Sequence, residues 1–234
     1  MSGVGMQVPQ SLLVVLESGT SVTALVYRAR PDPPSPMGAF VLAHGAGAGQ
    51  RSPFLTRFAQ ALADRALDVV TFNFPYTEQG RRLPDRAPVL EACYATVVEK
   101  VRQALPSAGA KLVIGGKSMG GRIATQVAAT RSALPVTGLV VLGYPLHPPG
   151  RPDTRRDAHL PSVRRPVLFV QGERDSFGTP GELAPVLDQM VPRPAMHVVN
   201  GGDHSFKVRR AGAPAQEAVE NDIQRVIADW IERL

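Results

Sequence analysis

The sequence predicts an α/β domain in which helices cover both faces of a mainly parallel sheet. Short apolar segments of strand length recur along the chain, and helical patterns lie between the later ones. Most of these segments are continuous rather than alternating, which is typical of strands buried on both faces. The 234 residues fit one such domain. We therefore expect a single domain over residues 1–234, with residues 1–10 as a loose N-terminal extension.

The expected sheet has eight strands and begins with an edge pair. Residues 12–16 and 22–27 are patterned less cleanly than the later segments and lie close together, as two antiparallel strands at an edge would. Residues 31–36, PDPPSP, predict a rigid loop. The remaining strands are expected at 39–43, 69–72, 111–115, 138–142, 167–171 and 197–199.

Helical patterns separate the later strands. Ser52 followed by Pro53 is typical of a helix start, and Thr179 with Glu182 forms a capping box ahead of another apolar face. Three more faces have helical spacing: Leu90, Tyr94, Val97, Val101 and Leu105; Ile123, Ala124, Val127 and Ala128; and Val219, Ile223, Val226, Ile227, Trp230, Ile231 and Leu234. Because strands and helices alternate, the sheet is expected to be mainly parallel.

Charge and cysteine content bear on partners and location. The net charge is +6 and the pI is near 10.0, so nucleic-acid binding must be weighed. The arginines are spread along the chain without base-stacking aromatics, which favours a solvated surface and no nucleic-acid partner. The single Cys93 excludes an internal disulfide and favours the cytoplasm. The apolar run at 12–16 is too short for a signal peptide or membrane span, so no membrane partner is expected.

The stretch VIGGKSMGGR, residues 113–122, has two interpretations. Gly-Lys-Ser ends a phosphate-binding P-loop, but that motif needs a glycine five residues before its Gly-Lys, where this chain has Lys111. Gly116-x-Ser118-x-Gly120 instead fits a sharp turn from a strand into a helix, where a nucleophilic serine is presented. The spacing therefore favours a nucleophile over a nucleotide site.

A base and an acid follow later strands. Asp175 comes after the strand at 167–171 and His204 after the strand at 197–199. In a parallel sheet these loops and the Ser118 turn meet at the same edge. Ser118, Asp175 and His204 are therefore the predicted catalytic residues, with Asp203 as a rival acid that is less suited because it adjoins His204. The remaining histidines are weaker candidates for the base: His44, His147, His159 and His197.

These motifs resemble a known superfamily. HGAGAG, FNFPYTEQG, GGKSMGGR, QGERDSFG and GGDHSF are together similar to α/β-hydrolases of a small, lidless, dienelactone-hydrolase-like branch. That branch includes chromatin-associated NSL-complex subunits, testis-expressed proteins and many bacterial homologues. The resemblance implies an α/β-hydrolase fold without a cap domain. Dienelactone hydrolases use a cysteine nucleophile, and this chain departs from them with Ser118.

Backbone N–H groups are expected to stabilise the oxyanion. One belongs to Met119, directly after the nucleophile, and the other to Ala46 in HGAGAG. A plain glycine-rich turn stays open as an alternative for the second position. Lys117 and Arg122 flank the nucleophile; they attract an anionic substrate or are simply solvated, and we favour solvation.

The segment from Gly143 to Pro166 bears on substrate size and charge. Its 24 residues include six prolines, which prevent a cap of packed helices and predict a stiff surface loop. An open site favours short acyl groups. The segment also carries cations that would favour anionic substrates: Arg151, Arg155, Arg156, Arg164 and Arg165.

The sequence thus predicts a serine hydrolase acting on an ester, thioester or related acyl bond of a small molecule, without metal or cofactor. A non-catalytic protein-interaction module with the same fold and a peptidase are the alternatives.

Overall fold

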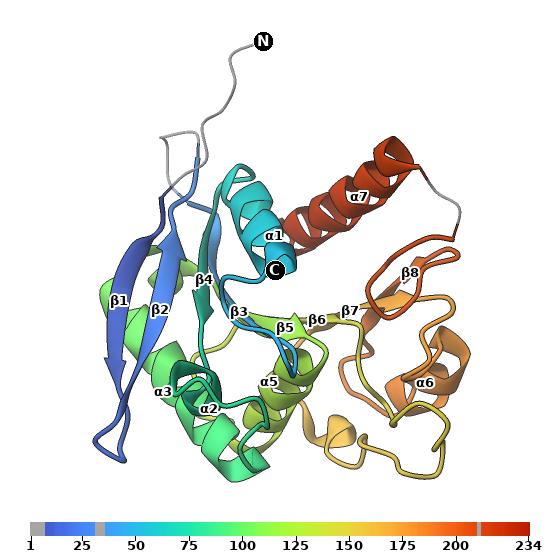
Figure 1. Ribbon diagram of the computed structural model, residues 1–234, viewed down its shortest axis with the longest axis horizontal. Coiled ribbons are helices and arrows are strands. Elements are labelled where there is room, and N and C mark those ends of the chain that lie inside the picture. Colours follow the sequence, from blue (N-terminus) through green and yellow to red (C-terminus); the bar gives the residue numbers. More distant parts are fainter. Residues whose placement is uncertain (1–7, 31–35, 210–211) are drawn as a thin grey trace.

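An eight-stranded sheet forms the centre of the molecule, in the order β1-β2-β4-β3-β5-β6-β7-β8 (Figure 1). β2 is antiparallel to both of its neighbours, and all other neighbouring strands are parallel. The mainly parallel sheet and its antiparallel edge pair are therefore confirmed. The strands are β1 (Gln10–Val15), β2 (Ser21–Tyr27), β3 (Gly38–Ala43), β4 (Leu67–Phe72), β5 (Leu112–Lys117), β6 (Gly138–Leu142), β7 (Val167–Gly172) and β8 (Ala195–Val199).

The structure, a computed structural model, describes residues 8–30, 36–209 and 212–234. Of the predicted loose extension at 1–10, residues 1–7 lie outside these ranges, whereas Gln10 begins β1. The predicted rigid loop at 31–36 lies outside them except for Pro36.

Helices cover both faces of the sheet. α1 (Pro53–Ala63) and α7 (Ala213–Glu232) pack on one face, and α3 (Ala87–Ala104), α5 (Met119–Thr130) and α6 (Pro180–Leu187) lie on the other (Figure 1). Two single-turn helices were not predicted from the sequence, α2 (Pro75–Glu78) and α4 (Ser107–Ala110). None of the helices in the described part of the chain is long and apolar enough to cross a membrane.

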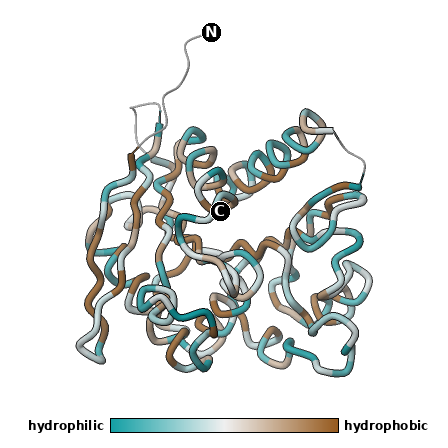
Figure 2. Tube along the Cα trace, in the orientation of Figure 1, coloured by the Kyte–Doolittle hydropathy of each residue, from teal (hydrophilic) through white to brown (hydrophobic). Residues whose placement is uncertain are grey.

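Each central strand contributes to two separate hydrophobic clusters. In β3, Ala39 and Val41 pack toward α3 and α5, whereas Phe40 and Leu42 pack toward α1 and α7. Apolar residues accordingly follow one another without interruption over residues 39–43 of β3 and residues 167–170 of β7 (Figure 2). This two-sided burial is the reason for the continuous apolar segments in the sequence.

The two predicted helix starts differ in detail. The capping box of α6 is present, since Thr179 Oγ1 accepts the Glu182 N–H at 3.3 Å and the Glu182 carboxylate accepts the Thr179 N–H at 2.8 Å. Ser52 stands at the N-cap of α1 ahead of Pro53, but its side chain makes no capping hydrogen bond.

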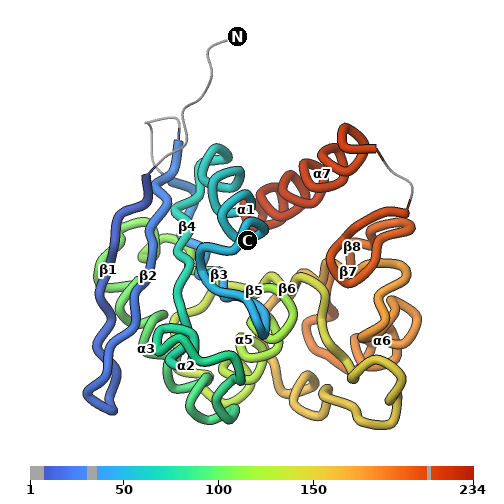
Figure 3. The backbone as a smooth tube through the Cα atoms, in the orientation of Figure 1, coloured from blue at the N-terminus to red at the C-terminus, as the bar shows by residue number. Residues whose placement is uncertain are grey.

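The segment between β6 and β7 forms no cap domain. It runs mostly as an irregular trace between β6 and β7 (Figure 3). Its only helical turn is a short 3₁₀ helix, η1 (Leu160–Ser162), which contacts α5 and α6. The prediction of a surface loop throughout is wrong, however, because Tyr144, Leu146 and Val163 are buried in the core. These apolar side chains anchor the segment at several points, and the prolines do not prevent this.

Candidate active site

Ser118 lies at the turn between β5 and α5 with a backbone φ of 53°, which is uncommon for a residue other than glycine. The turn packs tightly against the end of β3. A Cβ on Gly116 would lie 2.5 Å from the Ala43 carbonyl oxygen, and one on Gly120 would lie 2.6 Å from the same oxygen. Only glycine fits these two positions, which explains the glycine pattern around the serine.

Ser118, His204 and Asp175 form one line of hydrogen bonds. His204 Nε2 is 2.9 Å from Ser118 Oγ, and His204 Nδ1 is 2.8 Å from Asp175 Oδ2. Asp175 is 1% exposed. Because a carboxylate accepts hydrogen bonds, the proton belongs on Nδ1, which leaves Nε2 free to accept the serine proton. The structure therefore brings together the three side chains that the sequence predicted as catalytic, from the loops after β5, β7 and β8.

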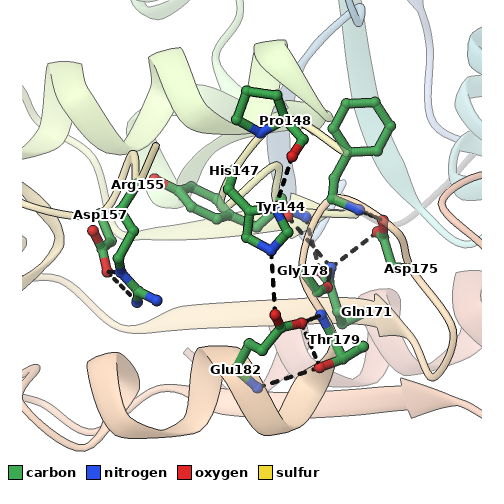
Figure 4. Close-up of polar contacts among 11 residues, drawn as sticks. Tyr144, His147, Pro148, Arg155, Asp157, Gln171, Asp175, Gly178, Thr179 and Glu182 are labelled. Atoms are coloured by element: carbon green, nitrogen blue, oxygen red, sulfur yellow. Dashed lines mark hydrogen bonds and ion pairs between the residues drawn. The ribbon is translucent and has the colours of Figure 1, made fainter. Parts of the chain in front are cut away.

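A buried glutamine holds Asp175 in place. Gln171 Nε2 donates to Asp175 Oδ2 at 2.9 Å and to the Gly178 carbonyl at 2.6 Å, and its Oε1 accepts the Tyr144 N–H at 2.8 Å (Figure 4). Asp175 Oδ1 accepts the Phe177 N–H at 2.8 Å. The sequence analysis missed the role of Gln171. The sequence pattern that could have indicated this role is a glutamine in a strand that is otherwise apolar apart from its terminal glycine. The structure shows this amide fully buried, so it needs hydrogen-bond partners.

Asp203, the rival acid, has a different role. Its Oδ1 accepts the N–H groups of Ser205 and Lys207 at 2.8 and 2.9 Å. Asp203 thus shapes the turn that carries His204, while Asp175 contacts the imidazole.

The two predicted oxyanion donors lie at the same cavity as Ser118. Met119 begins α5, where the first N–H groups of the helix lack partners within it, and Ala46 lies in the turn after β3. Within the described ranges, neither N–H donates to another residue of the chain. The assignment of both N–H groups as oxyanion donors stays a prediction.

His44 supports the turn that contains Ala46. It is fully buried; its Nε2 accepts the Phe74 N–H at 3.3 Å and its Nδ1 donates to the Gly45 carbonyl at 2.8 Å. Burial lowers the pKa of His44, so the ring is neutral. This histidine orients the backbone, and its ring forms hydrogen bonds with Gly45, Phe74 and Thr77 rather than with Ser118.

Lys117 departs from the favoured prediction of a solvated side chain. Its Nζ donates to the His204 carbonyl at 2.6 Å and lies 5.3 Å from the centre of the Phe206 ring. Burial lowers the pKa of Lys117 to about 8, and the negative charges of Asp175 and Asp203 oppose this shift. Lys117 therefore ties the His204 loop to the end of β5.

The other histidines pair elsewhere. His147 lies 3.3 Å from Glu182 (Figure 4), His159 Nε2 lies 2.9 Å from Thr125 Oγ1, and His197 lies 3.3 Å from Asp222. Of the histidines, only His204 contacts the serine turn through its ring.

A cavity of about 580 Å³ contains the reacting groups at its wall. Ser118, His204, Met119 and Ala46 line it together with apolar side chains such as Leu90. Phe177 also lines it, and its ring centre lies 4.2 Å from that of the His204 imidazole, with the two rings tilted by 31°. A small acyl compound in this cavity would lie beside Ser118, His204, Met119 and Ala46.

Comparison with known proteins agrees with this architecture. A family model described as an alpha/beta hydrolase domain matches residues 36–232. A lidless α/β serine hydrolase from Xanthomonas campestris superposes with a TM-score of 0.70 at 18% identity, over 95% of this chain and 94% of that one. A dienelactone hydrolase from Anabaena variabilis gives 0.73 at 19% identity, over 97% and 99%. Est1E from Butyrivibrio proteoclasticus, solved with ferulic acid bound, gives 0.72 at 14% identity, over 93% and 99%.

Proposed function

Because the chain belongs to the alpha/beta hydrolase domain family, we propose that it is a serine hydrolase that cleaves an ester, thioester or related acyl bond of a small substrate. The observation that carries the proposal is the hydrogen-bonded line from Ser118 through His204 to Asp175 at the wall of a cavity. Serine is a poor nucleophile at neutral pH, and this line supplies the base and the orienting acid that it needs.

In the first half of the reaction, Ser118 Oγ attacks the carbonyl carbon and His204 Nε2 takes the serine proton. The Asp175 carboxylate, 2.8 Å from Nδ1, stabilises the resulting imidazolium, and the carboxylate itself stays ionised. The N–H groups of Met119 and Ala46 donate to the oxygen that becomes negative.

Collapse of the tetrahedral intermediate expels the leaving group, which takes the proton from His204 Nε2. The acyl group stays on Ser118 Oγ. His204 then removes a proton from water, the hydroxide attacks the acyl carbon, and Ser118 leaves with the proton returned by His204. The products are a free acid and the alcohol or thiol of the substrate.

Labelling with a fluorophosphonate tests the nucleophile. The probe should react at Ser118 in the wild-type protein and not in Ser118→Ala. Ser52 lines the same cavity without a histidine beside it, so Ser52→Ala is the matched control and should be labelled like wild type. Absence of labelling in folded wild-type protein, or an adduct on another residue, would contradict the proposal.

The two alternative functions predict different experimental outcomes. A non-catalytic interaction module would show no turnover of any ester, and a peptidase would cleave amino-acid amides faster than esters of the same acyl group. The cytoplasmic location expected from the single cysteine also stays a prediction.

A further inference from the structure

Two arginines line the Ser118 cavity without an acidic partner. Arg122 lies in the first turn of α5 and Arg156 in the segment between β6 and β7. Among the described residues, neither guanidinium forms an ion pair with a carboxylate. A charge that is partly removed from water without a partner costs free energy, and an anionic ligand would reduce this cost for both arginines.

Arg122 is held with unused donors. Its Nη1 donates to Gln126 Oε1 at 3.2 Å, whereas its Nε is buried and has no hydrogen-bond partner. Burial lowers the pKa of Arg122, and the positive charge of Arg156 adds to this effect. Among the described residues, Nη2 of Arg122 has no hydrogen-bond partner and is not among the buried atoms, so it is the donor that an anion in the cavity would meet.

Arg156 is placed by its backbone. Its N–H donates to the Leu146 carbonyl at 2.8 Å, and its carbonyl accepts the hydroxyl of the buried Tyr144. Its guanidinium makes no hydrogen bond or ion pair within the described part of the chain, and Arg156 lines the cavity. Its neighbour Arg155 instead pairs with Asp157 (Figure 4).

The sequence analysis predicted that the five arginines of this segment favour anionic substrates, and the structure restricts that role to one of them. Of Arg151, Arg155, Arg156, Arg164 and Arg165, only Arg156 lines the cavity. Arg165 donates to the Ser132 carbonyl, and Arg164 is exposed. Arg122, which we expected to be solvated, joins Arg156 instead.

The other charged groups near the cavity do not cancel these two. Asp85 lines the cavity; its Oδ1 pairs with Arg81 at 2.7 Å, and its Oδ2 is buried without a hydrogen-bond partner, so this is one negative charge against the two arginines. Glu91 forms no ion pair with Arg122 and affects the pKa of Arg122 only through its charge. Burial raises the pKa of Glu91, which disfavours that negative charge. Lys117 adds a third cation, although its Nζ is occupied by the His204 carbonyl. The cavity therefore carries an excess of positive charge.

We propose that Arg122 and Arg156 together bind an anionic oxygen group, a carboxylate or a phosphate, on the substrate whose acyl bond Ser118 attacks. The substrate class is then a short ester or thioester with a second, acidic group. Guanidinium groups suit this role because their planar donors match carboxylate and phosphate oxygens two at a time. This inference rests on the proposed hydrolase function.

Matched ester pairs test the proposal. With the acid on the acyl side, mono-4-nitrophenyl succinate, glutarate and adipate are compared with 4-nitrophenyl butyrate, valerate and hexanoate, after subtraction of spontaneous hydrolysis. With the acid on the leaving group, 4-acetoxybenzoate and 4-acetoxyphenyl phosphate are compared with neutral 4-acetoxybenzamide. At low salt, kcat/KM should favour the acidic member of at least one pair by about tenfold or more, and salt should reduce this preference.

The arginine variants identify the cause. Arg156→Gln and Arg122→Gln should each lower the acidic-to-neutral ratio by about 10- to 100-fold, as expected for loss of a hydrogen bond to a charged group. Arg164→Gln removes a cation from the same segment outside the cavity and should leave the ratio at its wild-type value. No acidic preference in any pair, or the same ratio in Arg156→Gln as in Arg164→Gln, would overturn the proposal.

A binding measurement separates this inference from the hydrolase function. Calorimetry with benzoate and phenyl phosphate on Ser118→Ala needs no catalysis. Binding that is lost on adding Arg156→Gln supports the anion site even if no ester is turned over. Turnover of neutral esters without such binding would leave the hydrolase function standing and refute the anion site.

Discussion

Replacing Gln171 by glutamate puts a second carboxyl group against Asp175. Gln171 Nε2 lies 2.9 Å from Asp175 Oδ2, and both residues are buried. Two negative charges at that separation repel by about 6 kcal/mol at an effective dielectric constant of about 20. This repulsion equals about four pKa units at about 1.4 kcal/mol each. Near neutral pH, the introduced carboxyl group should therefore keep its proton in the folded state.

The sign of the effect on stability follows from this raised pKa. The unfolded chain loses the extra proton near pH 4.3, whereas the folded chain holds it to about pH 8. Folding is then favoured at low pH and loses about 1.4 kcal/mol for each pH unit above about 5. Between pH 5 and 7, Gln171→Glu should lose roughly 3 kcal/mol relative to wild type.

Urea unfolding of wild type, Gln171→Glu and Gln171→Met at several pH values measures this. Gln171→Met removes the same hydrogen bonds without adding a charge, so its stability deficit should not change with pH. A deficit of Gln171→Glu that stays constant from pH 5 to 8 would refute the placement of the amide nitrogen against Asp175.

Three further predictions concern Lys117, Gly120 and the open cavity. Because the pKa of Lys117 falls from 10.5 to about 8 on folding, the stability of wild type relative to Lys117→Met should rise by at most about 3 kcal/mol between pH 8 and 10.5; in the same urea unfolding, the stability of wild type relative to Lys100→Met should stay constant. Gly120→Ala puts a Cβ 2.6 Å from the Ala43 carbonyl oxygen and should destabilise by about 1–3 kcal/mol, whereas Gly109→Ala meets nothing within 4 Å; equal unfolding midpoints for the two variants would contradict this packing. Burial of acyl CH₂ groups, worth ~0.8 kcal/mol each, is limited without a cap, so kcat/KM on 4-nitrophenyl esters should be flat or falling beyond about four to six carbons; a steep rise toward long chains would contradict the open site.

Patterns local in the sequence predicted the fold well. Strands buried on both faces show as continuous apolar segments, and all eight expected strands are present. The loops of Ser118, Asp175 and His204 were identified because each follows such a strand, and parallel strands end at the same edge. The single turns α2 and α4 are too short to show a helical period, so the sequence did not reveal them.

The residues around the three side chains were harder to predict because their roles depend on side-chain direction. Lys117 is the last residue of β5 and was expected to be solvated, but its side chain turns inward to the His204 carbonyl. Arg155 and Arg156 are neighbours with the same chemistry, and only the fold of their segment decides which one lines the cavity. Gln171 gave a signal, a polar residue in a buried strand, but not the identity of its partner.

The most direct test of the central claim is to trap the acyl group on the protein. Wild-type protein is mixed with 4-nitrophenyl butyrate, quenched with acid within milliseconds to seconds, digested and examined by peptide mass spectrometry. We predict a butyryl group on Ser118, formed with a burst of 4-nitrophenol that does not exceed the protein concentration, and neither signal in Ser118→Ala. A butyryl group trapped on a residue other than Ser118, or equal turnover by Ser118→Ala, would contradict the assignment of Ser118 as the nucleophile.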